Sequence, residues 1–380
     1  MKTIIFGGSF DPPHVEHIEL CIEAVKELNP ERVVIVPTYY PPYKTQGYLP
    51  FETRCELCKV AFKDVCKEVI IDEIEKDMEG NNYASVMLPI LKEKYGDIAY
   101  IIGGDSLERF LTWKDPQKVV DTCPLIVVPR NHFEDVNVLI DKYKKDMGGE
   151  YFVLKYTGDH CSSSILKAKL LLNIATDEDI SKGVLDYIKK NNLFNEYDDV
   201  LEQLKSYQTE DLFNHSIQVC LMAVTLNTRM DLRLDFEKVF ISALLHDNAK
   251  QRKSIDGLDV PEDAIGTPVL HQFLGAEKAR RDFGIEDEEI LNGIKYHTSA
   301  KPNMTLFEKL IYTADSVSMD REYDPIPKIR EVVFNNFNDG FLCVLKHTYD
   351  SLIKRGIPIY NLTEKAYNFY KKDMENIPLL

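Results

Sequence analysis

The segment that decides the fold of this chain is IIFGGSFDPPHVEH, residues 4–17. It joins a short apolar strand, the Gly7-Gly8 turn and two histidines three residues apart, His14 and His17. Glycine lets a backbone come close to a polyanion, and the free N–H groups at the start of a helix attract phosphate. The segment therefore predicts a nucleotide-binding site in which two imidazoles stabilise charge on a phosphoryl oxygen. The alternative is an ordinary strand-to-helix turn with two polar residues in its first helical turn.

The length and composition predict two globular domains and exclude several classes of partner. At 380 residues the chain exceeds what one hydrophobic core usually serves. A net charge of -16 without any run of Lys and Arg disfavours nucleic acid, so small nucleotides are the expected anionic partners. The sequence shows neither about 20 uninterrupted apolar residues nor a signal-peptide pattern, which predicts a soluble cytoplasmic protein without a membrane partner. None of these features indicates the oligomeric state.

Six short apolar runs, mostly of β-branched residues, mark the expected strands of the first domain. They are residues 3–6, 33–36, 69–72, 98–102, 124–128 and 151–154. Helical patterns lie between most of them, which is typical of a doubly wound parallel sheet with an α/β, Rossmann-like fold. In such sheets ligands bind at the carboxyl ends of the strands, and both Gly7-Gly8 and Gly103-Gly104-Asp105 directly follow a strand.

The alternation of strands and helices stops at about Glu196. The remaining sequence shows amphipathic helical patterns at 198–206, 210–230, 235–250, 272–283, 287–297, 305–319, 338–354 and 362–374. A polar stretch at 189–196 ends the preceding helix, so we place a domain boundary there. The sequence thus predicts an α/β domain at 1–195 and an all-α domain at 196–380.

The eight cysteines are scattered among apolar residues, which favours reduced thiols over a disulfide framework. Cys55 and Cys58 form a CxxC, but it lies in a helical pattern and no second CxxC accompanies it. A zinc or redox site is therefore the weaker interpretation of this pair.

The first domain resembles the bacterial nicotinate-nucleotide adenylyltransferases of the HxGH nucleotidyltransferase superfamily, over about residues 1–194. Its matching motifs are GGSFDPPHVEH, PPYK at 41–44, GGDSLERFLTW, VVPR and the SSSILK segment at 162–167. Four positions depart from the family motifs. Glu16 replaces the glycine of HxGH, Tyr43 the histidine of PPHK, Ala84 the threonine expected after the tyrosine, and Lys167 an arginine.

This resemblance implies transfer of an adenylyl group from ATP to nicotinate mononucleotide, with Mg²⁺ bridging the phosphates. It implies that His14 and His17 contact the phosphates of ATP, that the helix start at Ser162–Ser164 and Lys167 hold pyrophosphate, and that Trp113 stacks on the pyridine ring. From the sequence alone, Trp113 is better interpreted as a core residue. The full set of implied nucleotide-binding residues is Gly7, Gly8, Ser9, Phe10, Lys44, Asp105, Trp113, Arg130, Ser163, Ser164 and Lys167.

The second domain carries a sparse series of imidazole and carboxylate side chains of the kinds that bind metals. They are His215, His246, Asp247, His271, His297 and Asp315. The pair His246-Asp247 interrupts an apolar helix face, ALLHDNAK, where unpaired polar groups would be costly to bury. A bound metal would offset that cost. Taken singly, each histidine is more often a core or surface residue than a ligand.

The ordered set of ligands resembles the HD superfamily of metal-dependent phosphohydrolases. The motifs HSIQV, LLHDNAK, HQFLGAEKA and LIYTADSVSMDR resemble those of bacterial HD hydrolases that cleave diadenosine tetraphosphate symmetrically to two ADP. We expect His215, His246, Asp247 and Asp315 to hold one ion and His271 and His297 a second, with Asp247 shared. The resemblance favours iron, with manganese or cobalt also suited to such ligands.

The same resemblance gives Asp247 and Lys250 catalytic roles and assigns polyphosphate binding to Lys250, Thr298 and Arg321. Without it, these last three would be exposed side chains at helix ends. Two alternatives remain open: a nucleotidase that acts on other nucleotides, and a protein in which one domain has become a nucleotide-sensing regulatory module.

Overall fold

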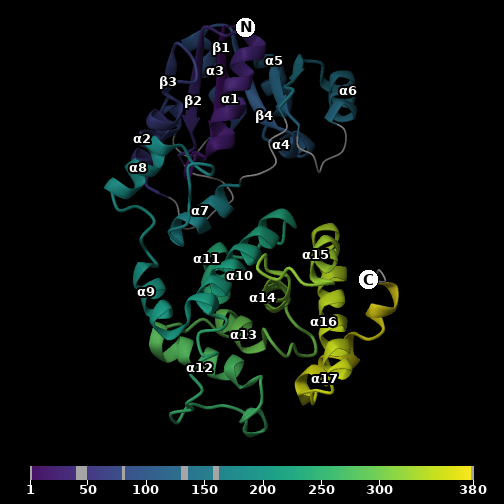
Figure 1. Cartoon of the computed structure of the whole chain (residues 1–380). Coiled ribbons are helices and arrows are strands. Elements are labelled where there is room, and N and C mark those ends of the chain that lie inside the picture. Colours follow the sequence, from purple (N-terminus) through teal and green to yellow (C-terminus); the bar gives the residue numbers. More distant parts are fainter. Residues whose placement is uncertain (1, 40–48, 79–81, 130–135, 157–161, 378–380) are drawn as a thin grey trace. The chain divides into compact units, whose positions relative to one another are not determined.

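The computed structural model describes residues 2–39, 49–78, 82–129, 136–156 and 162–377. Contacts between Cα atoms divide the chain into two compact units. Unit 1 comprises Met1–Lys167 and Ala175–Leu193, and unit 2 comprises Ala168–Ile174 and Phe194–Leu380. Figure 1 labels the elements of both units.

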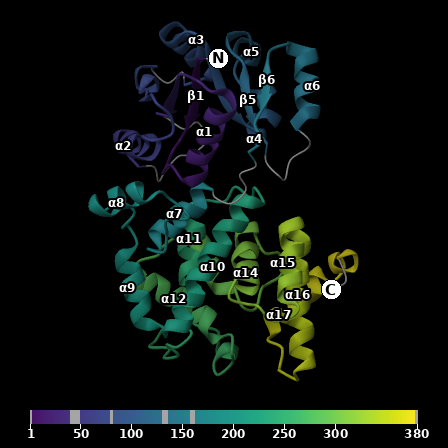
Figure 2. The same ribbon diagram turned by 45° about the horizontal axis from the view of Figure 1, so that its top comes forward.

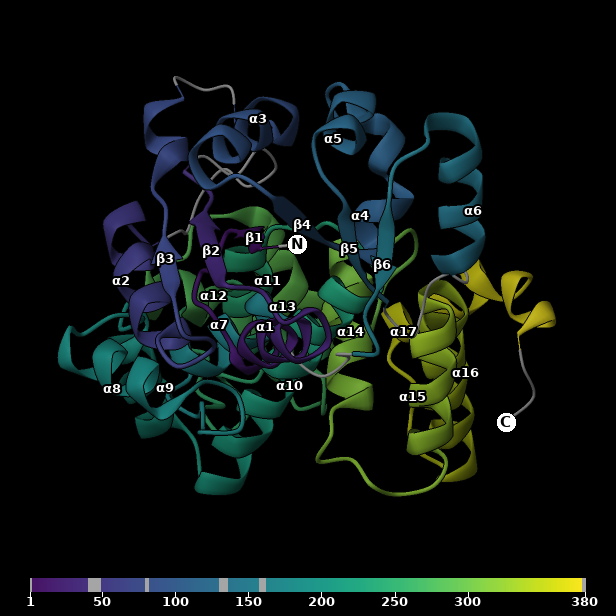
Figure 3. The same ribbon diagram turned by 90° about the horizontal axis from the view of Figure 1, so that it is seen from above.

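Unit 1 contains a six-stranded sheet in which every pair of neighbouring strands is parallel. The strand order is β3-β2-β1-β4-β5-β6, and Figure 3 shows the strands side by side in this order. The strands are β1 (Thr3–Gly8), β2 (Arg32–Pro37), β3 (Val69–Ile71), β4 (Ile98–Gly103), β5 (Leu125–Val128) and β6 (Tyr151–Val153). Each strand overlaps a predicted run, although β1, β2 and β4 extend beyond theirs, so the doubly wound α/β fold is confirmed.

Helices cover both faces of the sheet, which is why the central strands are almost continuously apolar. Ile4 and Ile5 in β1 and Val33 to Val36 in β2 are all buried, as expected for parallel strands covered on both sides. Figure 3 shows α1 on one face and α3 and α5 on the other. The helices of unit 1 are α1 (Val15–Leu28), α2 (Phe51–Phe62), α3 (Ala84–Tyr95), α4 (Gly104–Glu108), α5 (Pro116–Thr122), α6 (Val136–Met147) and α8 (Lys182–Lys190), with 3-10 turns η1 (Ile74–Asp77) and η2 (Phe110–Thr112). The helix α7 (Ser163–Leu171) begins in unit 1 and ends in unit 2.

Gly7 and Gly8, predicted as a turn, are the last two residues of β1 and pair with Val36 and Pro37 of β2. The strand order places them at the point where the direction of winding reverses. β1 pairs with β2 on one side and with β4 on the other, so the chain segments after β1 and β4 leave the same edge of the sheet. Crevices at this position are the usual ligand sites of such sheets. A Cβ atom at Gly8 would lie 3.1 Å from the ring of Phe10, so the close fold of the turn leaves little room for a side chain.

Unit 2 is built from helices around α10, which packs against both α11 and α14. Figure 2 shows these three helices and the neighbouring pair α15 and α16. The helices are α9 (Asp198–Tyr207), α10 (Glu210–Arg229), α11 (Phe236–Leu245), α12 (Leu270–Phe283), α13 (Glu288–Tyr296), α14 (Leu306–Val317), α15 (Ile326–Asn335), α16 (Phe337–Lys354) and α17 (Asn361–Tyr370), with 3-10 turns η3 (Glu262–Ala264) and η4 (Asp373–Asn376). The predicted all-α character is confirmed.

The helix α15 was not predicted from the sequence. Its segment IPKIREVVFN begins beside two prolines, which favour a turn in a reading of the sequence alone. Ile326, Ile329 and Val333 nevertheless recur at helical spacing and are buried. A proline is tolerated in the first turn of a helix because its missing N–H would have no partner there.

Across the described residues, no helix combines the length and the apolar character needed to cross a membrane.

Glu75 in η1 makes the stability of unit 1 depend on pH. Its carboxylate is buried and accepts the N–H of Tyr39 at 2.9 Å. Burial raises the pKa of Glu75 from 4.5 to about 7, although the Tyr39 N–H and the charge of Arg54 oppose the shift. Between these values the folded state holds a proton that the unfolded state has lost, so stability falls as the pH rises through this window and levels off above pH 7.

We expect Glu75→Gln to remove this loss of stability, which amounts to about 3 kcal/mol at 1.36 kcal/mol for each pH unit between the two pKa values. Urea unfolding at pH 5 to 8.5, followed by the fluorescence of Trp113, measures it, because this single tryptophan lies in unit 1. The control is Asp77→Asn, an exposed carboxylate in the same turn, which should keep the wild-type slope. If the free energy of unfolding of Glu75→Gln changed with pH as that of the wild type does, Glu75 would not be the cause of the pH dependence.

Candidate functional site

Arg54 fixes the turn that follows β1. This residue of α2 is only 2% exposed, and its guanidinium donates to three backbone carbonyl oxygens. The acceptors are those of Ser9 at 2.6 Å, Thr38 at 2.8 Å and Leu49 at 3.1 Å. One side chain therefore joins the segment after β1 to the segment after β2. The sequence did not predict this clamp.

We expect Arg54→Met to destabilise unit 1 by about 3 kcal/mol or more, because three carbonyl groups lose a charged donor in a buried place. The same variant should slow the adenylyl transfer that the sequence resemblance implies, since the segment after Gly7-Gly8 loses its support. Trp113 fluorescence during urea unfolding measures the first effect, and pyrophosphate release measures the second. Arg54→Lys keeps one charged donor, so its stability should lie between those of Arg54→Met and the wild type. If Arg54→Met were as stable as the wild type, the three hydrogen bonds of Arg54 would not contribute to the stability of unit 1.

His14 and His17 lie together at the start of α1. Their rings stack with centroids 3.6 Å apart, and the backbone N–H of His14 donates to Nδ1 of His17 at 3.2 Å. Because Nδ1 of His17 is an acceptor, the neutral ring carries its proton on Nε2. This arrangement places an imidazole N–H donor at a helix start, where the helix dipole favours an anion, although the backbone N–H of Val15 there already donates to the carbonyl oxygen of Asp179.

The side chain of Phe10, in the segment between β1 and α1, is not exposed. Its ring is fully buried and packs edge to face against Phe6, Phe62 and His17. Phe10 can therefore face a nucleotide only through its backbone, which adopts a positive φ of 44°. Ser9 contributes its carbonyl group to the Arg54 clamp.

Asp105 and Trp113 follow β4, at the edge of the sheet that also carries the Gly7-Gly8 turn. Asp105 lies in the first turn of α4. Trp113 is half-buried, packs on Phe110 with ring centroids 5.3 Å apart and borders the core of unit 1. A half-buried ring fits both the stacking role and the packing role considered for it.

The helix α7 begins at Ser163 and Ser164, as the SSSILK motif predicts. The hydroxyl of Ser162 accepts the N–H of Ile165 at 3.1 Å, which caps the helix start. Lys167 follows one turn later. Glu16 lies in the first turn of α1, where a helix favours an acidic residue. Lys44 and Arg130, together with Tyr43, lie outside the described residues.

The CxxC pair is packed inside α2. Cys55 and Cys58 are both buried, and burial raises the pKa of Cys55 to about 11 and that of Cys58 well above its ordinary value. Thiols held in the protonated form are poor metal ligands. Among the described residues, none of the candidate metal-binding groups includes a cysteine.

Three histidines of unit 2 are oriented by backbone carbonyl groups. Nδ1 of His246 lies 2.8 Å from the carbonyl oxygen of Ala243, that of His271 lies 2.7 Å from Pro268, and that of His297 lies 2.7 Å from Ile294. A carbonyl oxygen can only accept, so each Nδ1 carries the proton and each Nε2 presents its lone pair. Metal-binding histidines are commonly oriented in this way.

Asp247 lies at the centre of these histidines. It is 2% exposed, and its Oδ1 lies 3.2 Å from Nε2 of His271 and 3.3 Å from Nε2 of His297. Its Oδ2 lies 3.5 Å from Nε2 of His246. Three ring nitrogens that present lone pairs thus surround the two oxygens of one buried carboxyl group, an arrangement that a bound cation would stabilise.

Two further predicted ligands, His215 of α10 and Asp315 of α14, complete the cluster. Nε2 of His215 lies 3.0 Å from Oδ1 of Asp315, and the guanidinium of Arg321 donates to the same oxygen at 2.6 Å. Burial would raise the pKa of Asp315, but the Arg321 charge outweighs it and keeps the group ionised. The structure thus brings all six predicted metal ligands together.

Asp320 also belongs to this cluster, although it was not predicted. Its carboxylate lies 2.7 Å from Nδ1 of His215 and so takes the place that carbonyl groups take for the other three histidines. Arg330 of α15 holds this segment by donating to the carbonyl oxygens of Val317 and Ser318 at 2.8 Å and of Arg321 at 3.0 Å. The only signal in the sequence was a carboxylate five residues after Asp315.

The cluster fits a divalent metal centre. Three overlapping groups each bring their ligand atoms within 4.8 Å of one another: His215, His246 and Asp247; His246, His297 and Asp315; and Asp247, His271 and His297. Metal–ligand bonds of about 2.0–2.2 Å place neighbouring ligand atoms about 3 Å apart. Nε2 of His271 and Nε2 of His297 lie 3.2 Å apart with lone pairs facing each other, and the buried Nε2 of His246 has no hydrogen-bond partner among the described residues. A cation would satisfy all three atoms.

The three predicted phosphate-binding residues surround the centre. Nζ of Lys250 lies 3.2 Å from Oδ2 of Asp247 and 3.3 Å from Nε2 of His271. The hydroxyl of Thr298 lies 2.9 Å from Nε2 of His297 and 3.0 Å from that of His271. Arg321 is engaged with Asp315, through both the carboxylate and the backbone oxygen.

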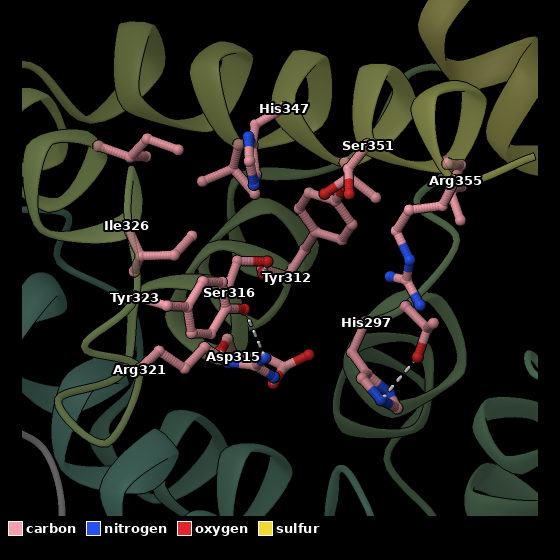
Figure 4. Close-up of a pocket in the computed structure, with 15 residues that line it drawn as sticks. His297, Tyr312, Asp315, Ser316, Arg321, Tyr323, Ile326, His347, Ser351 and Arg355 are labelled. Carbon is pink, nitrogen blue, oxygen red and sulfur yellow. Dashed lines mark hydrogen bonds and ion pairs between the residues drawn. The ribbon is translucent and has the colours of Figure 1, made fainter. Parts of the chain in front are cut away.

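A cavity of about 310 Å³ opens beside the centre (Figure 4). His297, Thr298, Asp315 and Arg321 line one side of it. Residues of α15 and α16 line the other. The metal centre therefore borders a space large enough for a small ligand.

The fold and the two sites define a nucleotidyltransferase-like α/β domain followed by a metal-binding HD domain. The cytidylyltransferase-like family matches residues 5–169, and the HD domain family matches residues 212–320. The second match contains every histidine and carboxylate of the cluster.

Curated relatives cover the whole chain as well as each half. A Mycoplasma genitalium protein named as a probable nicotinate-nucleotide adenylyltransferase/Ap4A hydrolase is 26% identical over 93% of this chain and 99% of its own length. A symmetrical bis(5'-nucleosyl)-tetraphosphatase of Halalkalibacterium halodurans is 31% identical over 44% of this chain and 93% of its own length. A probable nicotinate-nucleotide adenylyltransferase of Aquifex aeolicus is 33% identical over 41% of this chain and 94% of its own length.

The chain belongs to the nicotinate-nucleotide adenylyltransferase family through its first half and to the HD family of symmetrical bis(5'-nucleosyl)-tetraphosphatases through its second. Both resemblances stated from the sequence motifs are thereby confirmed, as is the fusion of the two.

Proposed function

We propose that the protein is a bifunctional enzyme. Unit 1 transfers an adenylyl group from ATP to nicotinate mononucleotide and releases pyrophosphate, and unit 2 hydrolyses diadenosine tetraphosphate to two ADP. The observation that carries the second activity is the clustering of six metal-binding side chains, Asp247 among them, beside a cavity. The stacked histidines at the start of α1 support the first. We place the boundary between the two functions at residue 195.

In the proposed first reaction a phosphate oxygen of nicotinate mononucleotide attacks the α-phosphorus of ATP, and the bond between the α- and β-phosphates breaks. His14 and His17 stabilise the charge that builds on the α-phosphate oxygens. The Gly7-Gly8 backbone approaches the phosphates closely, and the start of α7 with Lys167 holds the departing pyrophosphate. Trp113 stacks on the pyridine ring, and Mg²⁺ enters with ATP.

In the proposed second reaction water adds to one of the two central phosphorus atoms, and the bridging oxygen between them leaves with the other ADP. His215, His246, Asp247 and Asp315 would hold one ion, and His271 and His297 a second, with Asp247 shared. Such ions lower the pKa of water and polarise phosphate oxygens. Lys250, Thr298 and Arg321 bind the phosphate oxygens, and the mixed imidazole and carboxylate set suits iron, manganese or cobalt, of which we favour iron.

The first activity is tested with the intact protein, ATP, Mg²⁺ and nicotinate mononucleotide. We expect pyrophosphate and the dinucleotide product in equal amounts. ATP binding without pyrophosphate release would instead make unit 1 a nucleotide-sensing module, as Glu16 and Ala84 would then suggest.

The second activity is tested with diadenosine tetraphosphate after loading the protein with Fe²⁺ or Mn²⁺. We expect ADP as the sole nucleotide product, and loss of the reaction after the ions are removed by chelation. AMP together with ATP, or an unchanged substrate, would contradict the proposal. A panel of nucleoside monophosphates in the same assay distinguishes a general nucleotidase.

A further inference from the structure

His215 differs from the other three histidines of the metal centre in what orients its ring. The Nδ1 atoms of His246, His271 and His297 each lie beside a backbone carbonyl oxygen. His215 lies inside the long helix α10, where each carbonyl group accepts the N–H four residues later and is therefore already engaged. Its ring can be fixed only by an acceptor from another part of the chain.

Asp320 supplies that acceptor. Its Oδ2 lies 2.7 Å from Nδ1 of His215, and Nε2 on the other side of the same ring lies 3.0 Å from Oδ1 of Asp315. An ionised carboxylate only accepts, so Nδ1 carries a proton and Nε2 is the ring atom available to a metal. Among the described residues, none of the candidate groups of metal ligands includes Asp320. Asp320 therefore reaches the centre through His215 rather than as a ligand.

The backbone on either side of Asp320 is held in place, although 35% of its side-chain surface is exposed. Arg330 donates to three backbone carbonyl oxygens of this segment. Arg321 donates from its guanidinium to the carbonyl oxygen of Asp315 at 2.7 Å and from its backbone N–H to that of Ser318 at 3.1 Å. The carboxylate thus extends from a fixed turn, and little conformational freedom is lost when it contacts His215.

We propose that Asp320 is a positioning residue that orients His215 for metal binding and strengthens it as a ligand. The proposal rests on the metal centre proposed for the hydrolase of unit 2, and it identifies a residue on which the metal affinity of that centre depends. A carboxylate that accepts the outer N–H of a metal-bound imidazole raises the basicity of the ring. Loss of such a partner typically lowers metal affinity about 10- to 100-fold.

The test is a calorimetric titration of the metal-free intact protein with Mn²⁺. We expect Asp320→Ala to weaken Mn²⁺ binding about ten- to a hundredfold. Asp320→Asn keeps an oxygen that can accept the Nδ1–H but loses the charge, so its affinity should lie between those of Asp320→Ala and the wild type. Glu322→Gln removes an equal charge two residues away, from a side chain that is 71% exposed, and should bind Mn²⁺ as the wild type does. Unchanged affinity in Asp320→Ala, or equal affinities of Asp320→Ala and Asp320→Asn, would overturn the proposal.

A double-mutant cycle shows whether Asp320 acts through His215. His215→Ala should itself weaken Mn²⁺ binding, and Asp320→Ala should cause no further loss in that background. A further loss by the same factor would mean that Asp320 acts on the ion or on the fold without His215, which would overturn the proposal. Circular dichroism of the metal-free proteins checks that the helices of unit 2 remain folded.

The titration separates this inference from the proposed hydrolase activity, because it uses no nucleotide. If the wild type binds Mn²⁺ without cleaving diadenosine tetraphosphate, the proposed activity fails, and the comparison of variants still decides the role of Asp320. If the wild type cleaves the substrate and all Asp320 variants bind Mn²⁺ equally well, only the inference fails. A wild type that binds no Mn²⁺ would also overturn the inference.

Discussion

Asp247→Asn is expected to abolish the hydrolysis of diadenosine tetraphosphate, by at least about a thousandfold in kcat/KM, and to leave adenylyl transfer unchanged. Three imidazoles face this one carboxylate, with Nε2 atoms 3.2 to 3.5 Å from its oxygens. An amide has nearly the same shape but no charge, so it can neither bridge two cations nor balance the groups around it. The variant should therefore retain less metal as well as lose activity.

Metal content after gel filtration and the rates of both reactions measure these effects in the same sample. Asp211→Asn, an exposed carboxylate in the first turn of α10, is the matched control and should keep both metal and activity. Full metal content with full hydrolysis in Asp247→Asn would contradict the centre as described. Loss of both activities together would show general misfolding instead.

His17→Ala is expected to reduce kcat/KM for adenylyl transfer about a hundred- to a thousandfold, as does the loss of one donor that stabilises transition-state charge. The variant removes the Nε2 donor that the contact between Nδ1 and the His14 N–H defines. Hydrolysis in unit 2 should not change. Pyrophosphate release at saturating ATP and at low ATP separates an effect on kcat from one on binding.

Two further variants make this result specific. His17→Gln keeps an N–H donor at similar reach and should recover part of the activity. Lys26→Ala changes an exposed residue of the same helix and should have no effect. Equal activity of His17→Ala and the wild type would refute the role of the histidine pair, provided that Trp113 fluorescence shows unit 1 to be folded.

The strands of unit 1 and the ligand set of unit 2 could be predicted because their signals are local. A parallel strand that is buried on both faces is apolar along its whole length. Runs such as residues 33–36 can therefore be recognised as strands from the sequence alone. A metal ligand must be an imidazole or a carboxylate, so the six residues could be selected by type before their positions were known. The helix α15 was missed because neighbouring prolines hide a short apolar periodicity.

Other features depend on contacts that no local pattern encodes. Arg54 resembles any charged residue in the first turn of a helix, and only the folded chain shows three carbonyl oxygens around it. Asp320 acts through His215, which lies 105 residues away in sequence. The cavity wall formed by α16 likewise depends on the packing of α14, α15 and α16.

The carbonyl groups that orient the histidines also have a role in ending the helices. His246 directly follows α11, and His297 directly follows α13. Their partners, Ala243 and Ile294, are residues of the last helical turn. Each ring contact caps a carbonyl group there and selects the tautomer that can bind a metal, and the oxygen of Ala243 also accepts the backbone N–H of His246. Substitution of either histidine would therefore remove a contact at a helix end and a candidate metal ligand together.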